Sequence, residues 1–148
     1  MSVIYKFEVK KGEALEVLET ETKVSSAKDV YKFACFMEWN EHEQEHLYAI
    51  HLDAKNKIKG YTLVTMGLID RSHIHAREVF RSAIINGASR IILVHNHPSG
   101  DPTPSSQDIS STREMRCAGK IIGIQITDHI ILGEIDYYSL LDNGFIKD

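Results

Sequence analysis

The chain has 148 residues, of which 43% are hydrophobic and 26% charged, values that are ordinary for one globular domain with a single sizeable core. The formal net charge of −4 gives no global attraction to a phosphate backbone and argues against a dedicated nucleic-acid-binding protein. The N-terminus does not resemble a signal peptide and no apolar run reaches transmembrane length, so we expect a soluble, cytoplasmic protein with no membrane partner.

The N-terminal residues, 1–24, are predicted to form a hairpin extension. Residues 3–9 and 14–20 alternate in polarity well enough for two strands, and Lys11-Gly12 between them is typical of a turn. Such a hairpin is expected at the edge of the domain and carries no recognisable chemistry.

The first helix is predicted over residues 26–37, because Ser26 is followed three residues later by Asp29, which is typical of a helix N-terminus. The periodic spacing of apolar residues predicts the remaining elements. These are strands at 46–53 and 57–65, a helix at 76–87, a strand at 91–94, a helix at 106–118 ended by Gly119, strands at 121–126 and 130–133 joined by a turn at 127–129, and a short helix at 137–141.

Strands interleaved with helices predict an α/β fold with a mixed sheet flanked by helices. No internal repeat or low-complexity linker divides the chain, so residues 1–148 are expected to form a single domain.

Two histidines follow the apolar run Ile91 to Val94, which is predicted to be a short buried strand. Because side chains alternate in an extended chain, His95 and His97 should leave the end of this strand on the same side. With a carboxylate supplied a short loop later, they would form a His-His-Asp ligand set for zinc.

The loop after the histidines should be stiff, because all three prolines of the chain, Pro98, Pro102 and Pro104, lie in it. It ends at Ser105-x-x-Asp108, a spacing that is also typical of a helix N-terminal capping arrangement. Asp108 can serve both as a cap and as a ligand, since a side chain on the first turn of a helix is well positioned to bind a metal.

These residues resemble the JAMM/MPN+ metalloprotease motif, in which His-x-His is followed after seven residues by Ser and after two more by Asp. The surrounding sequence is similar to the RadC-like branch of this family. That similarity is carried by His-Asn-His-Pro-Ser-Gly-Asp-Pro at 95–102, Arg-Glu-Val-Phe at 77–80 and Asp-His-Ile-Ile at 128–131, and it extends from Ser25 to the C-terminus.

The resemblance implies a cytidine-deaminase-like (JAB/MPN) fold. RadC proteins usually carry a helix-hairpin-helix region before this domain, and 148 residues leave no room for it. The chain therefore looks like the stand-alone catalytic-type domain.

The resemblance also implies a role for each site residue. His95, His97 and Asp108 would hold Zn²⁺ with one position left for water, which zinc makes more acidic. Glu45 would be the general base, and the Ser105 hydroxyl would donate to the developing oxyanion. The implied reaction is hydrolysis of an amide bond in a peptide or protein substrate.

Two assignments have alternatives. Glu43 lies two residues before Glu45 and would share its face if the strand began early, which makes it a second candidate for the base. A second His-x-His pair, His73 and His75, is followed by no suitable carboxylate spacing, so we expect His75 to be a positioning or substrate-side residue and His73 to be exposed. The family usually has Pro at the position of Ala76.

Two further function classes compete with the hydrolase. One is a DNA-associated protein or metal-dependent nuclease linked to DNA repair, which would need a basic surface. The other is an inactive MPN scaffold without metal, which the presence of all three ligand residues argues against. The basic surface needed by the DNA-associated alternative would come from six arginines, Arg71, Arg77, Arg81, Arg90, Arg113 and Arg116.

Overall fold

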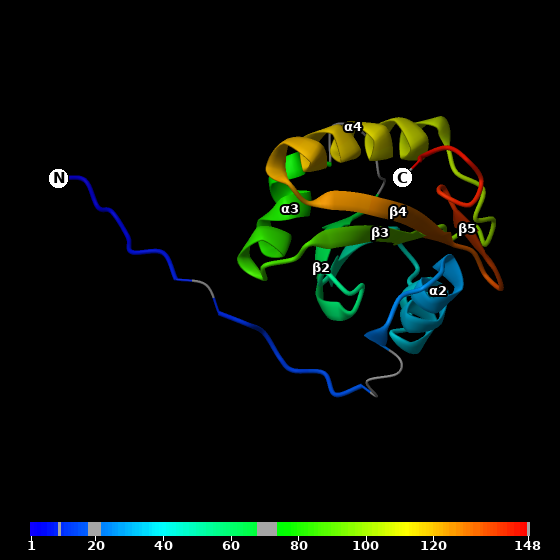
Figure 1. The fold of residues 1–148 in the computed structure, drawn as a ribbon, viewed down its shortest axis with the longest axis horizontal. Coiled ribbons are helices and arrows are strands. Elements are labelled where there is room, and N and C mark those ends of the chain that lie inside the picture. The colour runs from blue at the N-terminus through cyan, green and yellow to red at the C-terminus, as the bar shows by residue number, and fades with distance from the viewer. Residues whose placement is uncertain (9, 18–21, 68–73, 148) are drawn as a thin grey trace.

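The computed structural model describes residues 1–8, 10–17, 22–67 and 74–147. Within these residues, nine elements follow one another (Figure 1). They are α2 (Ala27–Phe36), a 3-10 helix η1 (Trp39–Glu41), β1 (His46–Leu52), β2 (Ile58–Met66), α3 (Ala76–Ile85), β3 (Arg90–Asn96), α4 (Ser106–Ile122), β4 (Gln125–Leu132) and β5 (Tyr137–Ser139).

The five strands form one sheet in the order β2-β1-β3-β4-β5. Only β3 and β4 pair in parallel, and the other three neighbouring pairs are antiparallel. The prediction of an α/β fold with a mixed sheet is therefore confirmed, and β3, the strand that leads into His95 and His97, is the central strand.

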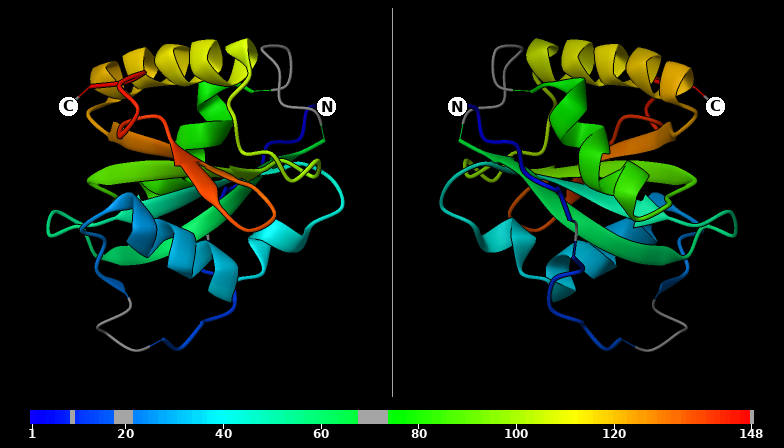
Figure 2. Two further views of the ribbon diagram at one scale, coloured as in Figure 1. Left: turned by 90° about the vertical axis from the view of Figure 1, so that its right-hand side faces the viewer. Right: turned by 90° about the vertical axis from the view of Figure 1, so that its left-hand side faces the viewer.

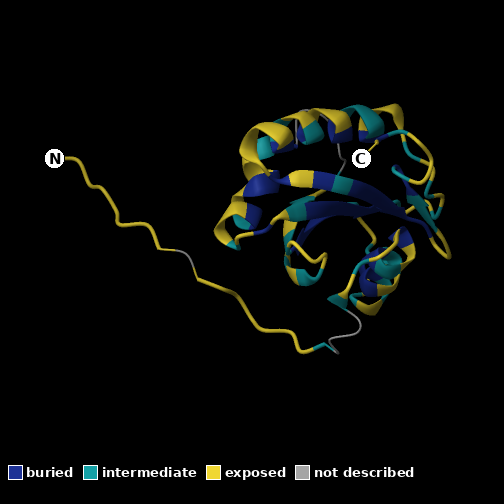
Figure 3. Ribbon diagram, in the orientation of Figure 1, coloured by how far each residue is buried: buried dark blue, intermediate teal, exposed yellow. Residues whose placement is uncertain are grey.

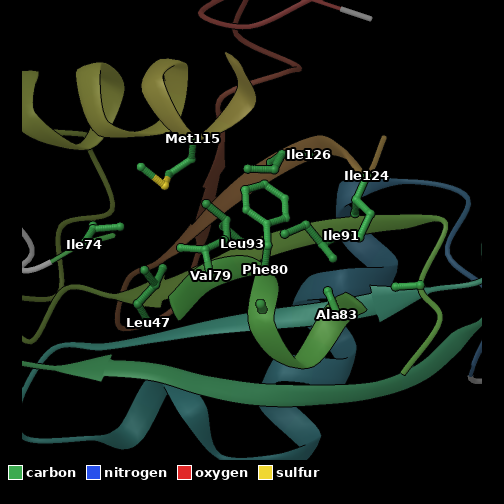
Figure 4. Packing of buried hydrophobic residues seen from close by; sticks show 12 residues of the cluster. Leu47, Ile74, Val79, Phe80, Ala83, Ile91, Leu93, Met115, Ile124 and Ile126 are labelled. Carbon is green, nitrogen blue, oxygen red and sulfur yellow. The ribbon is translucent and has the colours of Figure 1, made fainter. Parts of the chain in front are cut away.

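Helices cover both faces of the sheet (Figure 2). Helices α3 and α4 lie over one face, where Phe80 and Met115 pack against Leu93 and Ile126 (Figure 4). Helix α2 and η1 lie over the other face. Their residues pack there against the alternate residues of the central strands, which are Tyr48, Ile50, Leu52, Ile92, Val94, Ile130 and Leu132.

The alternation along β3 decides where its polar end points. Ile91 and Leu93 belong to the core beneath α3 and α4, and Ile92 and Val94 belong to the core beneath α2. Continuing this period of two sends His95 toward the α4 face and Asn96 toward the α2 face.

The first helix begins as predicted. Ser26 and Asp29 form a reciprocal capping box, and the Asp29 carboxylate accepts hydrogen bonds from the backbone N–H groups of Ser25 and Ser26 at 2.8 and 3.1 Å. Satisfying these otherwise unpaired donors is why the helix begins here.

The predicted N-terminal hairpin is wrong for the described residues. Residues 3–8 and 14–17 form no strand, and residues 9 and 18–20 lie outside the described part of the chain. Figures 1 and 3 show this segment as an exposed chain leading away from the sheet. A two-stranded hairpin is only marginally stable without an apolar partner surface, so alternation alone does not produce it.

Helix α4 does not end at Gly119, as predicted, but four residues later at Gly123, which has the left-handed φ of 88°. Gly119 lies inside the helix for another reason, which is close packing. A Cβ atom there would stand 2.4 Å from the Ile124 carbonyl oxygen and 3.1 Å from the Phe80 ring.

The predicted turn at 127–129 and helix at 137–141 are also wrong. Thr127, Asp128 and His129 lie within the continuous strand β4, and residues 137–139 form β5. Asp128 is tolerated in a buried strand because its carboxylate accepts hydrogen bonds from the Ser139 hydroxyl at 2.6 Å and the Leu141 N–H at 3.0 Å.

Candidate metal centre

Three potential metal ligands meet where β3 ends and α4 begins. His95 is the penultimate residue of β3, His97 directly follows the strand, and Asp108 lies on the first turn of α4. The His95 and His97 Nε2 atoms are 3.0 Å apart, and the Asp108 carboxylate oxygens lie 3.4 Å from His95 Nε2 and 3.2 Å from His97 Nε2.

The loop between the histidines and Asp108 is held by its own hydrogen bonds. The His97 N–H donates to the Leu132 carbonyl of β4 at 2.8 Å. Farther along, the Asp101 carboxylate accepts from the N–H and the hydroxyl of Thr103 at 3.0 and 2.7 Å. With three prolines, this loop connects the end of β3 to the start of α4 in a defined geometry.

A hydrogen-bond partner at Nδ1 fixes the orientation of each imidazole ring. His97 Nδ1 lies 2.8 Å from the Asp101 carbonyl oxygen, to which it can only donate, and His95 Nδ1 lies 2.6 Å from His129 Nε2. Each of these contacts leaves Nε2 as the atom that faces the other two ligands. Such partners orient the histidines of metal sites.

The charges at the site depend on burial and on the neighbouring groups. Burial lowers the pKa of His95 well below its ordinary value, so this imidazole is neutral at pH 7. Burial by itself would raise the pKa of Asp108, but hydrogen bonds from His97 and the Ser105 N–H lower it instead. Asp108 is therefore an ionised carboxylate beside a neutral imidazole, which is the state in which metal ligands bind.

This donor set could bind a metal ion. Two imidazole nitrogens and one carboxylate oxygen lie within 4.8 Å of one another, and all three side chains are buried or half-buried. Nitrogen and oxygen ligands in this combination suit divalent transition metals, and a three-ligand set leaves a further coordination position open.

Glu45 lies beside this group. The antiparallel pairing of β1 and β3 ends at Leu47 and His95, and Glu45 lies two residues before Leu47, just beyond this pairing. Burial by itself would lower the pKa of His97, but Asp108, the Asp101 carbonyl and the negative charge of Glu45 raise it above its ordinary value. Glu43, by comparison, is exposed in a bend.

Ser105 is the N-cap of α4, and the capping box predicted with Asp108 is present. The Asp108 N–H donates to Ser105 Oγ at 3.0 Å, and the Ser105 N–H donates to Asp108 Oδ2 at 2.8 Å. Since Oγ accepts in this pair, its own hydroxyl hydrogen is available to donate, and the side chain is exposed at the edge of the site.

The second His-x-His pair is only partly described. His73 and Arg71 lie outside the described residues. His75 is exposed and caps α3 with its backbone carbonyl, which accepts from the N–H groups of Glu78 and Val79 at 2.9 and 3.1 Å. It does not belong to the metal-ligand group.

The arginines proposed as a basic surface lie in different places. Arg77 and Arg81 on α3 are exposed and lie 3.9 Å from Glu78. Arg113 donates to the Phe145 carbonyl. Arg90 and Arg116 line a pocket of about 430 Å³ with Lys120 and Lys147, where β3 begins and not where it carries His95.

Three polar residues around the site were not predicted to have these roles. His129 of β4 contacts His95, and Thr112 of α4 contacts His129 at 2.6 Å. Asn96 holds the segment that carries Glu45, because it accepts from the His46 N–H at 2.8 Å and donates to the carbonyls of His42 and Gln44 at 3.2 and 3.0 Å. The only signal in the sequence was that buried polar groups in apolar strands need partners.

The fold and the site together define a mixed-sheet α/β protein in which a His-x-His pair and an Asp that could hold a metal ion lie at the end of the central strand. Residues 24–145 match the RadC-like JAB domain family. The chain belongs to this family, and its sheet with helices on both faces is consistent with the JAB/MPN fold.

Curated relatives agree with this assignment. The chain is 44% identical over 131 residues to a UPF0758 protein of Methanosarcina mazei, an alignment that covers 88% of this chain and 57% of the relative. It is 47% identical over 109 residues to a UPF0758 protein of Syntrophomonas wolfei, covering 74% and 46%. The chain thus spans about half the length of the curated relatives it matches. Within the described residues, no helix is both long and apolar enough to cross a membrane.

Proposed function

We propose that this chain is a zinc-dependent hydrolase of the JAMM type that cleaves amide bonds in a peptide or protein substrate. The observation that supports this most directly is the convergence of His95 Nε2, His97 Nε2 and the Asp108 carboxylate within 3.0–3.4 Å of one another. These three side chains would hold the ion. Bound zinc would polarise the scissile carbonyl and increase the acidity of water.

Glu45 is the proposed general base. It would take a proton from the attacking water and deliver it to the leaving amine, as a carboxylate beside the reacting atoms can do. Against the effect of burial, the negative charge of Glu45 helps to raise the pKa of His97, and this supports the assignment over Glu43, which is exposed in a bend.

Ser105 is the proposed oxyanion donor. Its Oγ accepts the Asp108 N–H, which leaves the hydroxyl hydrogen to donate to the substrate carbonyl oxygen as negative charge develops there. The same capping pair fixes the position of Oγ relative to the ligand Asp108.

The first experiment is metal analysis of the purified protein, with about one zinc per chain expected. His97→Ala should lose zinc at near-neutral pH, and His75→Ala, in the other His-x-His pair, should retain it. Full zinc occupancy in His97→Ala would refute the ligand assignment.

The second experiment measures hydrolysis of a peptide library. Glu45→Gln should retain zinc while turnover falls by ~10²–10⁴-fold, and the control Glu43→Gln should keep wild-type turnover. Loss in Glu43→Gln alone would transfer the role of base to Glu43. A metal-dependent nuclease would instead cleave DNA and bind it with a steep dependence on salt, which a fluorescence titration would detect.

A further inference from the structure

A chain of three short hydrogen bonds runs behind the candidate metal centre. His95 Nδ1 lies 2.6 Å from His129 Nε2, and His129 Nδ1 lies 2.6 Å from Thr112 Oγ1. Thr112 Oγ1 in turn donates to the Asp108 carbonyl oxygen at 2.6 Å. The side chains of His95, His129 and Thr112 are all buried, so water does not compete for these bonds.

The direction of every bond in this chain follows from its last member. A carbonyl oxygen only accepts, so the single hydroxyl hydrogen of Thr112 goes to Asp108. Thr112 Oγ1 must then accept from His129 Nδ1–H. A neutral His129 carries no hydrogen on Nε2, which therefore accepts from His95 Nδ1–H. The His129 side chain is buried, and burial disfavours a charged imidazole.

The consequence falls on His95. With its hydrogen on Nδ1, the neutral ring has its lone pair on Nε2, the atom that faces His97 and Asp108. The opposite tautomer would place a hydrogen on Nε2 and block metal binding through that atom.

We propose that His129 and Thr112 are positioning residues that hold His95 in the Nδ1–H tautomer and join it to the helical turn that carries Asp108. The inference rests on the proposed metal-binding function and extends it to two residues outside the ligand motif. Through these residues, strand β4 and the body of α4 would support ligands that come from β3 and from the first turn of α4. Outer partners of this kind typically change metal affinity by about 10–100-fold.

Zinc affinity, measured by competition with a chelator at fixed pH, tests the proposal. His129→Leu should weaken binding by about 10–100-fold. Thr112→Val, which keeps the shape but removes the hydroxyl, should also weaken it, and Thr112→Ser should recover wild-type affinity. The control is Ser110→Ala on the same helix, whose hydroxyl donates to the Gln107 carbonyl outside this chain of bonds, and its affinity should be unchanged.

A second readout does not depend on zinc. In ¹⁵N NMR spectra of the metal-free protein, His95 should be the Nδ1–H tautomer in the wild type and should lose this preference in His129→Leu. Wild-type affinity in a folded His129→Leu protein, or an Nε2–H His95 in the wild type, would overturn the proposal. If the wild type bound no zinc, the zinc hydrolase would fail, and the tautomer would still decide whether His129 and Thr112 position His95.

Discussion

Ser105 caps α4 and is also the proposed oxyanion donor, and a single substitution can separate the two roles. Its Oγ completes the capping box of α4, and its hydroxyl hydrogen is available to a substrate. If Ser105 is only a cap, Ser105→Ala should cost ~0.5–2 kcal/mol of stability, whereas glycine at an N-cap costs only a few tenths of a kcal/mol. Any loss of turnover that both variants share therefore belongs to the hydroxyl.

We expect Ser105→Gly to melt close to the wild type and to retain zinc, while turnover falls by ~10²–10³-fold because the oxyanion donor is missing. Thermal unfolding, metal analysis and peptide hydrolysis measured on the same preparation test this. Wild-type turnover in the folded, zinc-loaded Ser105→Gly protein would reduce Ser105 to a helix cap.

His51 gives the protein a pH-dependent stability away from the metal centre. Burial, and secondarily the charge of Lys59, lowers the pKa of His51 to about 4, and Asn86 Nδ2 lies 3.1 Å from its Nδ1. In the unfolded chain His51 has the ordinary pKa of ~6.5. Between about pH 6.5 and about pH 4 the unfolded chain therefore binds a proton at His51 that the folded chain does not bind. The His51 contribution to the free energy of unfolding therefore decreases as pH falls from about 6.5 to about 4.

Urea unfolding at pH 7 and pH 4.5 measures this contribution. His51→Gln should lose less stability between the two pH values than the wild type does, because it cannot take up the proton. Thr62→Val, which removes a neighbour 3.4 Å from His51 Nε2 without removing a titrating group, should keep the wild-type pH difference. An equal pH difference in His51→Gln and the wild type would contradict the assignment.

Among the individual residues, the three metal-ligand candidates could be predicted from the sequence, but the residues that contact them from behind could not. His95, His97 and Asp108 are separated by short spacings that a strand end and a helix start convert into proximity. His129 is 34 residues from His95, and Asn96 is 50 residues from His46. No local pattern encodes such contacts, which exist only once β4 and β1 have paired with β3.

Among the elements, the helices and strands with strong apolar periodicity and a capping signal were predicted well, as for α2 and β1. Two of the errors came from reading one or a few residues as breaks. Gly119 was predicted to end α4, and Thr127 to His129 were predicted to form a turn. Tertiary contacts decide both cases, namely the Phe80 ring against Gly119 and the Ser139 hydroxyl on Asp128.

Gly119→Ala distinguishes an ordinary interior helix position from a close packing contact by the sign of its effect. At an ordinary interior helix position, alanine would stabilise the protein by up to about 1 kcal/mol relative to glycine. At Gly119, a Cβ atom 2.4 Å from the Ile124 carbonyl oxygen must displace α4 from β4, and we expect a net loss of about 1–3 kcal/mol.

Denaturant unfolding measures this loss. Gly123→Ala is the control, because its Cβ atom would meet open space and its only cost is the left-handed φ of 88°. That cost should be about 1–2 kcal/mol. A stabilised Gly119→Ala protein would show that the helix can move away without loss.

The segment between α2 and β1 should depend on Asn96. Besides the three hydrogen bonds of Asn96, the Gly67 N–H donates to the Glu45 carbonyl at 2.8 Å, and the Trp39 and Tyr48 rings stack at 3.9 Å. Asn96→Ala removes the first of these contacts. We expect zinc affinity to stay near wild type while turnover falls by up to about 10²-fold, because a displaced base costs rate more than binding.

Gln44→Ala is the matched control, since Gln44 contributes only its backbone carbonyl to this contact and its side chain is exposed. Its turnover should be unchanged. Unchanged turnover in Asn96→Ala would show that the other contacts of the segment hold Glu45 in place without Asn96.

For the whole molecule, the class of fold was predictable because interleaved strands and helices restrict the layer arrangement. The strand order was not, since pairing β1 between β2 and β3 and placing β4 parallel to β3 depends on long-range contacts. The single-domain assignment stays a prediction. This order places the central strand between both cores, so that its polar end meets the start of α4 at the edge of the sheet.

Through Asp108, the stability of the folded chain would depend on the concentration of free metal. Its carboxylate receives the Ser105 N–H and also faces His97, so an ion held there would cross-link β3 to the first turn of α4. A cross-link that only the folded chain can make is governed by mass action, and free metal at 100 times its dissociation constant adds about 2.7 kcal/mol of stability. Depleting the metal would then abolish activity and also remove this cross-link, which would lower the melting temperature of the folded chain.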